Sequence, residues 1–324
     1  MTMPNVHQIM EAAMPGDAVF NMATAIRTWL KGHGNDSHIL ANHIAPSLKS
    51  HALPYNRGRL RPGDILLYHY ALSTEVSSYV TAQKALGVKT VLLYHNMTPA
   101  RYFRYEDPLL YKQLQNGQQE LSTLRDSVDL AVAMSDFSKV ELSALGYRNI
   151  AVLPAVIIDE KYEVPPDPDV LKRWGDGRTI LLFVGRIAPN KKQEDLIKAF
   201  YFYKRINPHS SLLLVGALGT TQVYYRWVQE LAEYLKLSDV HFCGHVTQSE
   251  LNAYYKVADV FVSMSEHEGF GVPLVESMHF GIPVIAYKAT AVPETLGEAG
   301  IMVKRKDFPV IAELIDMLVS DKEL

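Results

Sequence analysis

The chain has 324 residues, too many for one comfortable hydrophobic core and about right for two domains. Apolar residues make up 48% and charged residues 21%, as in ordinary soluble globular proteins, and the net charge of −3 gives no reason to expect a nucleic-acid partner. The single cysteine, Cys243, excludes an internal disulfide and lies in an apolar segment, so we expect it in the core. No apolar segment has membrane-spanning length and the amino terminus lacks the apolar core of a signal peptide, so we expect a cytoplasmic protein.

Strand-like and helix-like segments alternate through the first half of the chain. Short runs rich in Val, Ile, Leu and Tyr predict strands, and the amphipathic segments between them predict helices. This alternation is typical of a parallel sheet covered by helices. We expect strands at residues 6–9, 37–41, 64–70, 89–95, 130–134 and 149–156, and helices at residues 19–31, 73–86, 107–126 and 137–145.

Four residues of this half lie where a parallel sheet forms its ligand sites, at the turns that follow strands. They are Gly16 in the first strand-to-helix turn, His69 and His95 at the ends of two strands, and Ser135 before a helix. Position alone leaves two roles open for each of them. Each is either a structural residue, such as a helix cap in the case of Ser135, or a ligand contact.

A change of composition predicts a linker at residues 158–178. The segment is charged, and it contains three prolines within residues 165–168 followed by two glycines. Asp167, Pro168 and Asp169 spell D-x-D, a triplet that holds a metal ion in some other enzymes. Because this triplet lies in a proline-rich segment and not at the end of a strand, we expect no metal site there.

The alternation of strand and helix resumes at Thr179. Thr247 and Glu250 form a T-x-x-E capping box that starts one of the helices. The predicted organisation is therefore a domain at residues 1–157, a linker at 158–178 and a domain at 179–324. In the second domain we expect strands at residues 180–184, 211–215, 240–243, 259–264, 283–287 and 301–303, and helices at residues 193–206, 222–235, 248–257, 273–280 and from about 308.

A basic motif follows the first strand of the second domain, with the sequence G-R-I-A-P-N-K-K from Gly185 to Lys192. The guanidinium of Arg186 can fork onto phosphate oxygens, and Lys191 adds a point charge five residues later. Basic residues at the end of a strand are commonly only solvated. A phosphate role therefore depends on a second feature at the same edge of the sheet.

That second feature is the segment from Ala258 to Tyr287, which has the pattern of a complete strand–turn–helix–strand unit. Gly269 and Gly271 remove side chains from the turn, and the helix start at Val272 offers unpaired backbone N–H groups. A phosphate is the natural ligand of such a turn. Two carboxylates flank it, Glu268 just before the turn and Glu276 about one turn inside the helix, and both suit sugar hydroxyls better than phosphate.

The segment E-G-F-G-V-P-L-V-E, from Glu268 to Glu276, resembles the E-x7-E signature of retaining glycosyltransferases of the group 1 (family 4) class. The basic motif is similar to the G-R-x4-K of the same family, although Lys192 stands where family members often have Gly. The resemblance implies a GT-B fold, in which two Rossmann-like, doubly wound parallel-sheet domains face each other across a cleft. The first would be the acceptor-side domain and the second the donor domain.

The resemblance also implies roles for individual residues. In the family, the first Glu of the signature lies at the donor sugar, the second binds ribose hydroxyls, and the Arg and Lys hold the diphosphate. Carried over, these roles fall on Glu268, Glu276, Arg186 and Lys191, and a His near the hexose corresponds to His95. The family also places a glycine-bearing first loop and a small-residue turn near the donor or the cleft. The full set of expected site residues is thus Glu268, His95, Arg186 and Lys191 for catalysis, and Glu276, Gly269, Phe270, Gly271, Val272, Gly16 and Ser135 for donor binding.

The expected activity is transfer of a hexose from a nucleotide-diphosphate sugar, GDP- or UDP-linked, to a glycan or lipid-linked acceptor in cell-surface polysaccharide synthesis. We expect no metal and no other cofactor, because Arg186, Lys191 and the helix start supply positive charge for the leaving diphosphate. The resemblance implies retention by front-face attack. The alternatives are a sugar-nucleotide epimerase of GT-B fold and a non-catalytic sugar-nucleotide-binding protein.

Two further expectations concern membrane contact and the coupling of the domains. Arg57, Arg59 and Arg61 could touch an anionic bilayer, which would place the protein at the inner face of the membrane. Family members usually continue into a terminal helix that returns to the first domain. Because the sequence stops at Leu324, we expect either a shortened chain or weaker coupling between domains.

Overall fold

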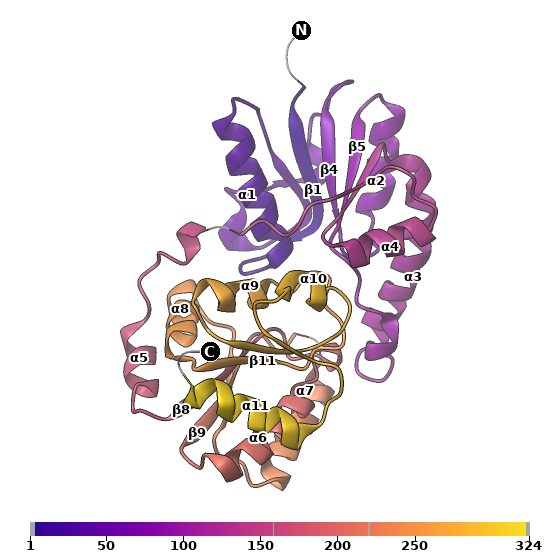
Figure 1. Cartoon of the computed structure of the whole chain (residues 1–324). Helices are drawn as coiled ribbons and strands as arrows, with labels where there is room; N and C mark the ends of the chain where they lie inside the picture. Colours follow the sequence, from indigo (N-terminus) through magenta and orange to yellow (C-terminus); the bar gives the residue numbers. More distant parts are fainter. Residues whose placement is uncertain (1–3, 158, 220, 322–324) are drawn as a thin grey trace. The chain divides into compact units, whose positions relative to one another are not determined.

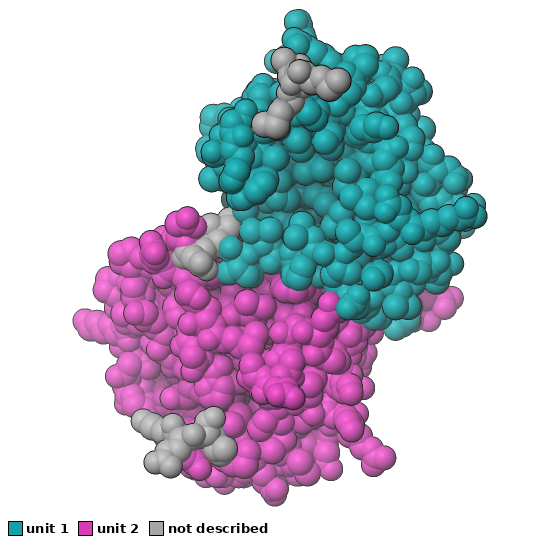
Figure 2. All heavy atoms as spheres, turned by 45° about the horizontal axis from the view of Figure 1, so that its top comes forward, with its two compact units in different colours: residues 1–101, 109–157 teal, residues 102–108, 158–324 magenta. Residues whose placement is uncertain are grey.

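The computed structural model describes residues 4–157, 159–219 and 221–321. Contacts divide the chain into two compact units, coloured teal and magenta in Figure 2. Unit 1 comprises residues 1–101 and 109–157, and unit 2 comprises residues 102–108 and 158–324.

Over its described residues, unit 1 is built on a seven-stranded parallel sheet in the order β3-β2-β1-β4-β5-β6-β7. Figure 1 labels β1, β4 and β5 of this sheet. The strands are β1 (Val6–Ala13), β2 (Ile39–Ile44), β3 (Leu53–Pro54), β4 (Ile65–Tyr70), β5 (Lys89–Tyr94), β6 (Leu130–Ala133) and β7 (Ile150–Val152). The helices are α1 (Ala18–Gly32), α2 (Val76–Ala85), α3 (Pro108–Leu124) and α4 (Asp136–Ala144), with short 3-10 turns η1 (Pro46–Leu48), η2 (Tyr55–Arg57), η3 (Ala100–Phe103) and η4 (Arg125–Ser127).

The strand order of unit 1 fixes where a ligand site can form. From β1 the chain adds strands outward to β2 and β3, and it then returns to place β4 against the other side of β1. The order therefore reverses between β1 and β4. The crevice at the carboxyl ends of two such strands is the usual ligand site of a doubly wound sheet.

Unit 2 repeats this plan, its described residues forming a six-stranded parallel sheet in the order β10-β9-β8-β11-β12-β13. Here the order reverses between β8 and β11. The strands are β8 (Thr179–Val184), β9 (Ser210–Val215), β10 (Val240–Gly244), β11 (Val260–Ser263), β12 (Val284–Tyr287) and β13 (Ile301–Val303). The helical segments are η5 (Asp159–Lys161), α5 (Pro168–Trp174), η6 (Pro189–Lys191), α6 (Gln193–Ile206), α7 (Gln222–Tyr234), α8 (Gln248–Val257), α9 (Val272–His279), α10 (Val292–Leu296) and α11 (Phe308–Ser320).

The core of unit 2 lies between this sheet and its helices. The central strand β8 is apolar on both faces, and Leu182 and Phe183 are almost completely buried, as expected for a parallel strand covered on both sides. Helices α6 and α11 lie side by side on the sheet (Figure 1) and bury Phe200 and Ile311. Each such side chain contributes roughly 1.5–3 kcal/mol of hydrophobic stabilisation. The core thus holds β8 and β11 rigidly beneath the loops that follow them.

The predicted fold class, two doubly wound parallel-sheet domains, is confirmed. The structure adds three elements that we did not predict: β3, α5 and α10. Helix α5 lies within residues 158–178, where Asp167 accepts hydrogen bonds from the backbone N–H groups of Asp169 and Val170, and Pro168 occupies the first helical turn. Proline is tolerated at that position, so the prolines that suggested a linker are compatible with a helix start. Trp174 of this helix is buried in the core of unit 2, whereas Cys243, expected in the core, is half-buried and packs against that core.

Candidate active site

The switch point of the second sheet brings two of the predicted motifs to one edge. The loop after β8 carries Arg186 and Lys191, and the loop after β11 carries Glu268. Because β8 and β11 are adjacent and parallel, both loops leave the sheet at its carboxyl edge. This is the edge at which doubly wound sheets bind ligands.

Backbone contacts tie the two loops together. The N–H of Glu266 donates to the carbonyl of Asn190 at 2.8 Å, and the Asn190 side-chain amide donates to the carbonyl of His267 at 3.3 Å. Gly216 directly follows the neighbouring strand β9, and a Cβ added there would lie 2.1 Å from the carbonyl oxygen of Gly185. Glycine at position 216 is therefore required for this close approach, and the basic loop is fixed from both sides.

Lys191 and Glu268 form a direct ion pair across the switch point. The Lys191 Nζ lies 2.7 Å from both carboxylate oxygens of Glu268, and the two side chains are 19% and 13% exposed. A charged hydrogen bond of this kind is worth about 1.5–3 kcal/mol, more than a fully exposed pair. An ammonium group has three donors, so Lys191 can orient Glu268 and still donate to a phosphate oxygen.

Arg186 differs from Lys191 in its exposure. Its side chain is exposed and has no hydrogen-bond or ion-pair partner among the residues that the structure describes. Its backbone is fixed, because the Gln193 side-chain amide donates to the Arg186 carbonyl at 2.9 Å. A guanidinium on a rigid backbone is available to bind phosphate oxygens in a bidentate manner.

Helix α9 begins at the same edge, directly after Gly271. This glycine has a φ of 96°, and a Cβ there would lie 3.0 Å from a methyl carbon of Leu274. Gly271 at the N-cap makes no side-chain cap hydrogen bond, so within the described residues the N–H group of Val272 remains available to an anion. Gly269 and Phe270 complete the turn between Glu268 and this helix start.

Residues after β12 hold this turn in place. The hydroxyl of Thr290 accepts a hydrogen bond from the Glu268 N–H and donates one to the Glu268 carbonyl, both at 2.8 Å. The hydroxyl of Thr295 donates to the carbonyl of Phe270. Thr290 has a φ of 47°, an uncommon conformation for a β-branched residue. No local pattern in the sequence indicates this support, because it comes from a segment that meets the turn only in the folded unit.

Glu276 lies on α9 between two tyrosines. One carboxylate oxygen accepts from the Tyr162 hydroxyl at 3.0 Å and the other from the Tyr255 hydroxyl at 2.7 Å. Tyr255 is buried, and burial together with the charge of Glu276 raises its pKa well above the ordinary value, so it remains a donor. The two tyrosines fix the carboxylate and leave it further acceptor capacity for a ligand hydroxyl.

A second set of ion pairs joins the two loops to neighbouring elements of the same unit. Lys306 Nζ lies 2.9 Å from Glu266 and 2.8 Å from Asp195, and Lys192 lies 3.6 Å from Glu266. Burial alone would raise the pKa of Glu266, but the hydrogen bond and charge of Lys306, together with the charge of Lys192, hold it below its ordinary value. The carboxylate of Glu266 therefore has a structural role, in ion pairs with Lys306 and Lys192.

Three predicted site residues belong to unit 1. Gly16 lies in the exposed turn after β1 with a φ of 74°, and Asp17 beside it caps α1 through the N–H groups of residues 19 and 20. Ser135 is buried and caps α4 by accepting from the Ser138 N–H at 3.2 Å. His95 follows β5, and its Nε2 lies 2.8 Å from Nδ1 of His69.

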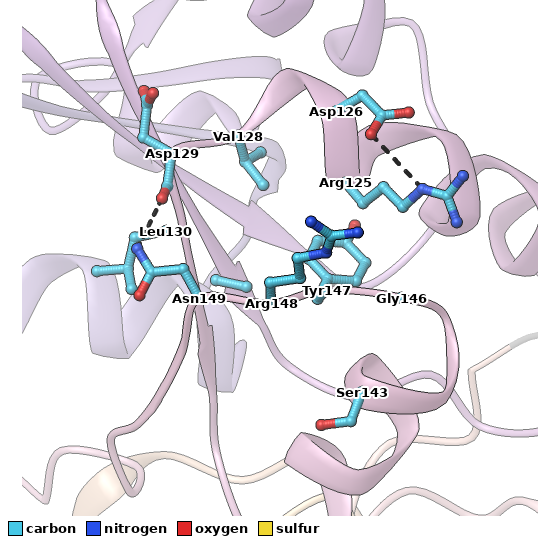
Figure 3. A pocket seen from close by; sticks show the side chains of 11 residues that line it. Arg125, Asp126, Val128, Asp129, Leu130, Ser143, Gly146, Tyr147, Arg148 and Asn149 are labelled. Atoms are coloured by element: carbon cyan, nitrogen blue, oxygen red, sulfur yellow. Dashed lines mark hydrogen bonds and ion pairs between the residues drawn. The ribbon is translucent and has the colours of Figure 1, made fainter.

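Other features of the described residues lie away from these loops. A pocket of about 720 Å³ lies at the amino ends of β6 and β7, where Figure 3 shows Arg125 paired with Asp126 and Asn149 bonded to the Asp129 backbone. It lies at the sheet edge opposite the predicted site of this unit. Within the described ranges, no cluster of three or more His, Cys, Asp or Glu side chains could hold a metal ion, and no helix is long and apolar enough to cross a membrane.

Two doubly wound units, with a basic loop and a helix start at the switch point of the second, define a protein of GT-B fold. Solved structures share this architecture over 98% of the chain. One is that of Anabaena Alr3699/HepE in complex with UDP-glucose, with a TM-score of 0.75, 17% identity and 90% of that chain covered. Another is WaaG, a glycosyltransferase involved in lipopolysaccharide biosynthesis, with a TM-score of 0.68, 14% identity and 91% covered.

Residues 171–324 match the family described as "Glycosyl transferases group 1". The second unit is therefore similar to the group 1 glycosyltransferases over most of its length. The chain is 26% identical over 267 residues to O-antigen chain mannosyltransferase B of Escherichia coli, covering 79% of the chain and 66% of the relative. It is 30% identical over 171 residues, 48% of the chain, to a GDP-mannose-dependent alpha-(1-6)-phosphatidylinositol monomannoside mannosyltransferase of Mycolicibacterium smegmatis. The chain spans 66% of the first relative and 44% of the second, which is less than two thirds of the length of either.

Proposed function

We propose that this protein is a retaining glycosyltransferase that moves a hexose from a nucleotide-diphosphate sugar to a glycan or lipid-linked acceptor. The observation that carries the proposal is the pairing of Lys191 with Glu268 at the switch point, beside Arg186 and an uncapped helix start. The family of the second unit and the names of its relatives support it.

The reaction breaks the bond between the anomeric carbon and a diphosphate oxygen, which keeps the electron pair. The anomeric carbon forms a new bond to an acceptor hydroxyl oxygen, and the acceptor loses its proton. Negative charge grows on the leaving diphosphate, and Arg186, Lys191 and the N–H of Val272 can stabilise it with groups already in position. These groups would make a metal ion unnecessary, so we expect transfer to survive a chelator.

The two glutamates have separate roles in this proposal. Glu268, oriented by Lys191, would contact the reacting sugar, and Glu276, oriented by its two tyrosines, would accept hydrogen bonds from ribose hydroxyls. His95 of unit 1 would contact a hydroxyl of the donor hexose. Gly16 and Ser135 would shape the donor side of the same unit, and retention would follow from front-face attack.

The donor is the finer part of the proposal. The Mycolicibacterium relative is named for GDP-mannose, and the HepE structure was solved with UDP-glucose, so these two nucleotide sugars should be tested first as donors. The test is a thermal-shift screen against GDP-, UDP- and ADP-sugars, followed by detection of transferred sugar. A ligand at a hundred times its dissociation constant should stabilise the protein by roughly 2.7 kcal/mol. Formation of an epimer, or binding without turnover, would contradict transfer and identify an epimerase or a binding protein instead.

We also propose contact between unit 1 and an anionic membrane surface, where lipid-linked acceptors reside. Arg57, Arg59 and Arg61 line one pocket of about 380 Å³ together with His7 and His38. The three guanidiniums have no ion-pair partner within the described part of the chain. Flotation with anionic vesicles should carry the protein, and zwitterionic vesicles should not. Equal flotation by a variant with all three arginines changed to Gln would contradict this contact.

A further inference from the structure

Three polar side chains form a continuous hydrogen-bonded chain across the first sheet. They come from adjacent strands: Gln8 from β1, His69 from β4, and His95 from the residue after β5. His69 Nε2 lies 2.9 Å from the Gln8 Oε1, and His69 Nδ1 lies 2.8 Å from the His95 Nε2. This chain of hydrogen bonds crosses the switch point between β1 and β4 and ends at the carboxyl edge of the sheet.

The direction of each hydrogen bond follows from the contact that Gln8 makes at the other end of this hydrogen-bonded chain. The Gln8 Nε2 donates to the backbone carbonyl of Ala23 at 2.8 Å, and a carbonyl can only accept. The amide oxygen of Gln8 must therefore face His69, whose Nε2 donates to it. A neutral His69 then has an unprotonated Nδ1, which accepts from the Nε2–H of His95.

Burial keeps both rings neutral. Gln8 is completely buried and His69 is 3% exposed. Burial, with a smaller effect from His95, lowers the pKa of His69 well below its ordinary value, and burial alone lowers the pKa of His95 to about 4. On α4, the carboxylate of Glu141 accepts hydrogen bonds from the Tyr94 hydroxyl and the Asn96 side-chain amide. A neutral His95 that carries its proton on Nε2 has a bare Nδ1.

We propose that Gln8 and His69 are positioning residues that fix His95 in the Nε2–H tautomer, so that its bare Nδ1 accepts a hydrogen bond from a hydroxyl of the donor sugar. The inference rests on the proposed function for its substrate, but the tautomer itself rests only on the hydrogen bonds. His95 then acts as an acceptor for the sugar. It does not serve as a cation beside the diphosphate or as a proton donor to it.

The test is the ring-nitrogen NMR spectrum of the full chain labelled with ¹⁵N-histidine at neutral pH, in which bare and protonated ring nitrogens resonate far apart. The His95 signals are identified by their loss in His95→Asn. We expect His95 with a bare Nδ1 and a protonated Nε2. A His95 protonated on Nδ1, or on both nitrogens, would overturn the inference, whether or not the protein turns over a donor.

Two matched variants of His69 test the positioning role. His69→Gln keeps one acceptor and one donor, so His95 should retain its tautomer and turnover should stay near the wild-type value. His69→Leu removes the acceptor, so His95 should populate both tautomers, with kcat lower by about tenfold, the scale of one hydrogen bond, and a smaller change in KM for the donor. Equal kcat for the Leu and Gln variants would refute the positioning role. If the tautomer is as proposed but no donor is turned over, the proposed function fails and the hydrogen-bonded chain stands.

Discussion

The ion pair between Lys191 and Glu268 makes a quantitative prediction. We consider Lys191→Met, Glu268→Gln and the double variant. The 2.7 Å contacts join two side chains that are less than one fifth exposed, so the coupling should approach that of a charged hydrogen bond, about 1.5–3 kcal/mol. Each single change should therefore destabilise unit 2 by a similar amount, and the double variant should lose much less than the sum.

The assay is a double-mutant cycle in urea, with the transition of unit 2 followed separately if the two units unfold independently. Lys204 and Asp239 provide a matched control pair in the same unit, with a distance of 2.9 Å and exposures of 19% and 31%. Lys204→Met should shift the same transition without lowering turnover, whereas Lys191→Met should lower turnover by about 100-fold, since it removes charge that meets the leaving diphosphate. A coupling below about 0.5 kcal/mol would show that Lys191 does not hold Glu268 in solution, and equal turnover of the two lysine variants would refute its catalytic role.

Three further predictions follow from the same unit. Glu276→Gln should weaken donor binding by about 1.5–3 kcal/mol with little change in turnover, and Tyr162→Phe should weaken it less, as calorimetry would show; unchanged affinity for both would exclude a ribose role. The pKa of Glu266 is lowered in the folded state, so the stability that Glu266 contributes is complete above pH 4.5, its ordinary pKa, and is lost as the pH falls through its folded-state pKa. Lys306→Met should make stability depend less steeply on pH in acid denaturation. An unchanged pH profile in this variant would contradict the role of Lys306. Transfer should persist in EDTA, and activity restored only by magnesium or manganese would overturn metal independence.

Local sequence patterns predicted most of the fold. Helices α6 and α8 begin and end where their periodicity and caps indicate, and the capping box of Thr247 and Glu250 is formed as predicted. Helix α5 was missed because three nearby prolines suggested a linker, although one of them occupies the first helical turn. The short elements β3 and α10 have too few residues for a periodic pattern.

The site was predictable as separate motifs and not as an arrangement. Lys191 and Glu268 are 77 residues apart in sequence, and their contact depends on β8 lying beside β11, which packing decides and no local pattern reveals. For the same reason, no local pattern predicts the contact of Thr290 with Glu268, or the contacts of Tyr162 and Tyr255 with Glu276. The sequence offered His69 and His95 as competing candidates, whereas the fold joins them in one hydrogen-bonded chain.

The central claim is that Glu268 contacts the reacting sugar while the nucleotide is held elsewhere. Its most direct test is the turnover of Glu268→Gln at saturating concentrations of the donor that gives the largest thermal shift, measured beside nucleotide affinity by calorimetry. We predict turnover lower by about 100-fold or more, with nucleotide affinity within a few fold of wild type. Transfer at the wild-type rate by Glu268→Gln would contradict the assignment of this turn as the catalytic site.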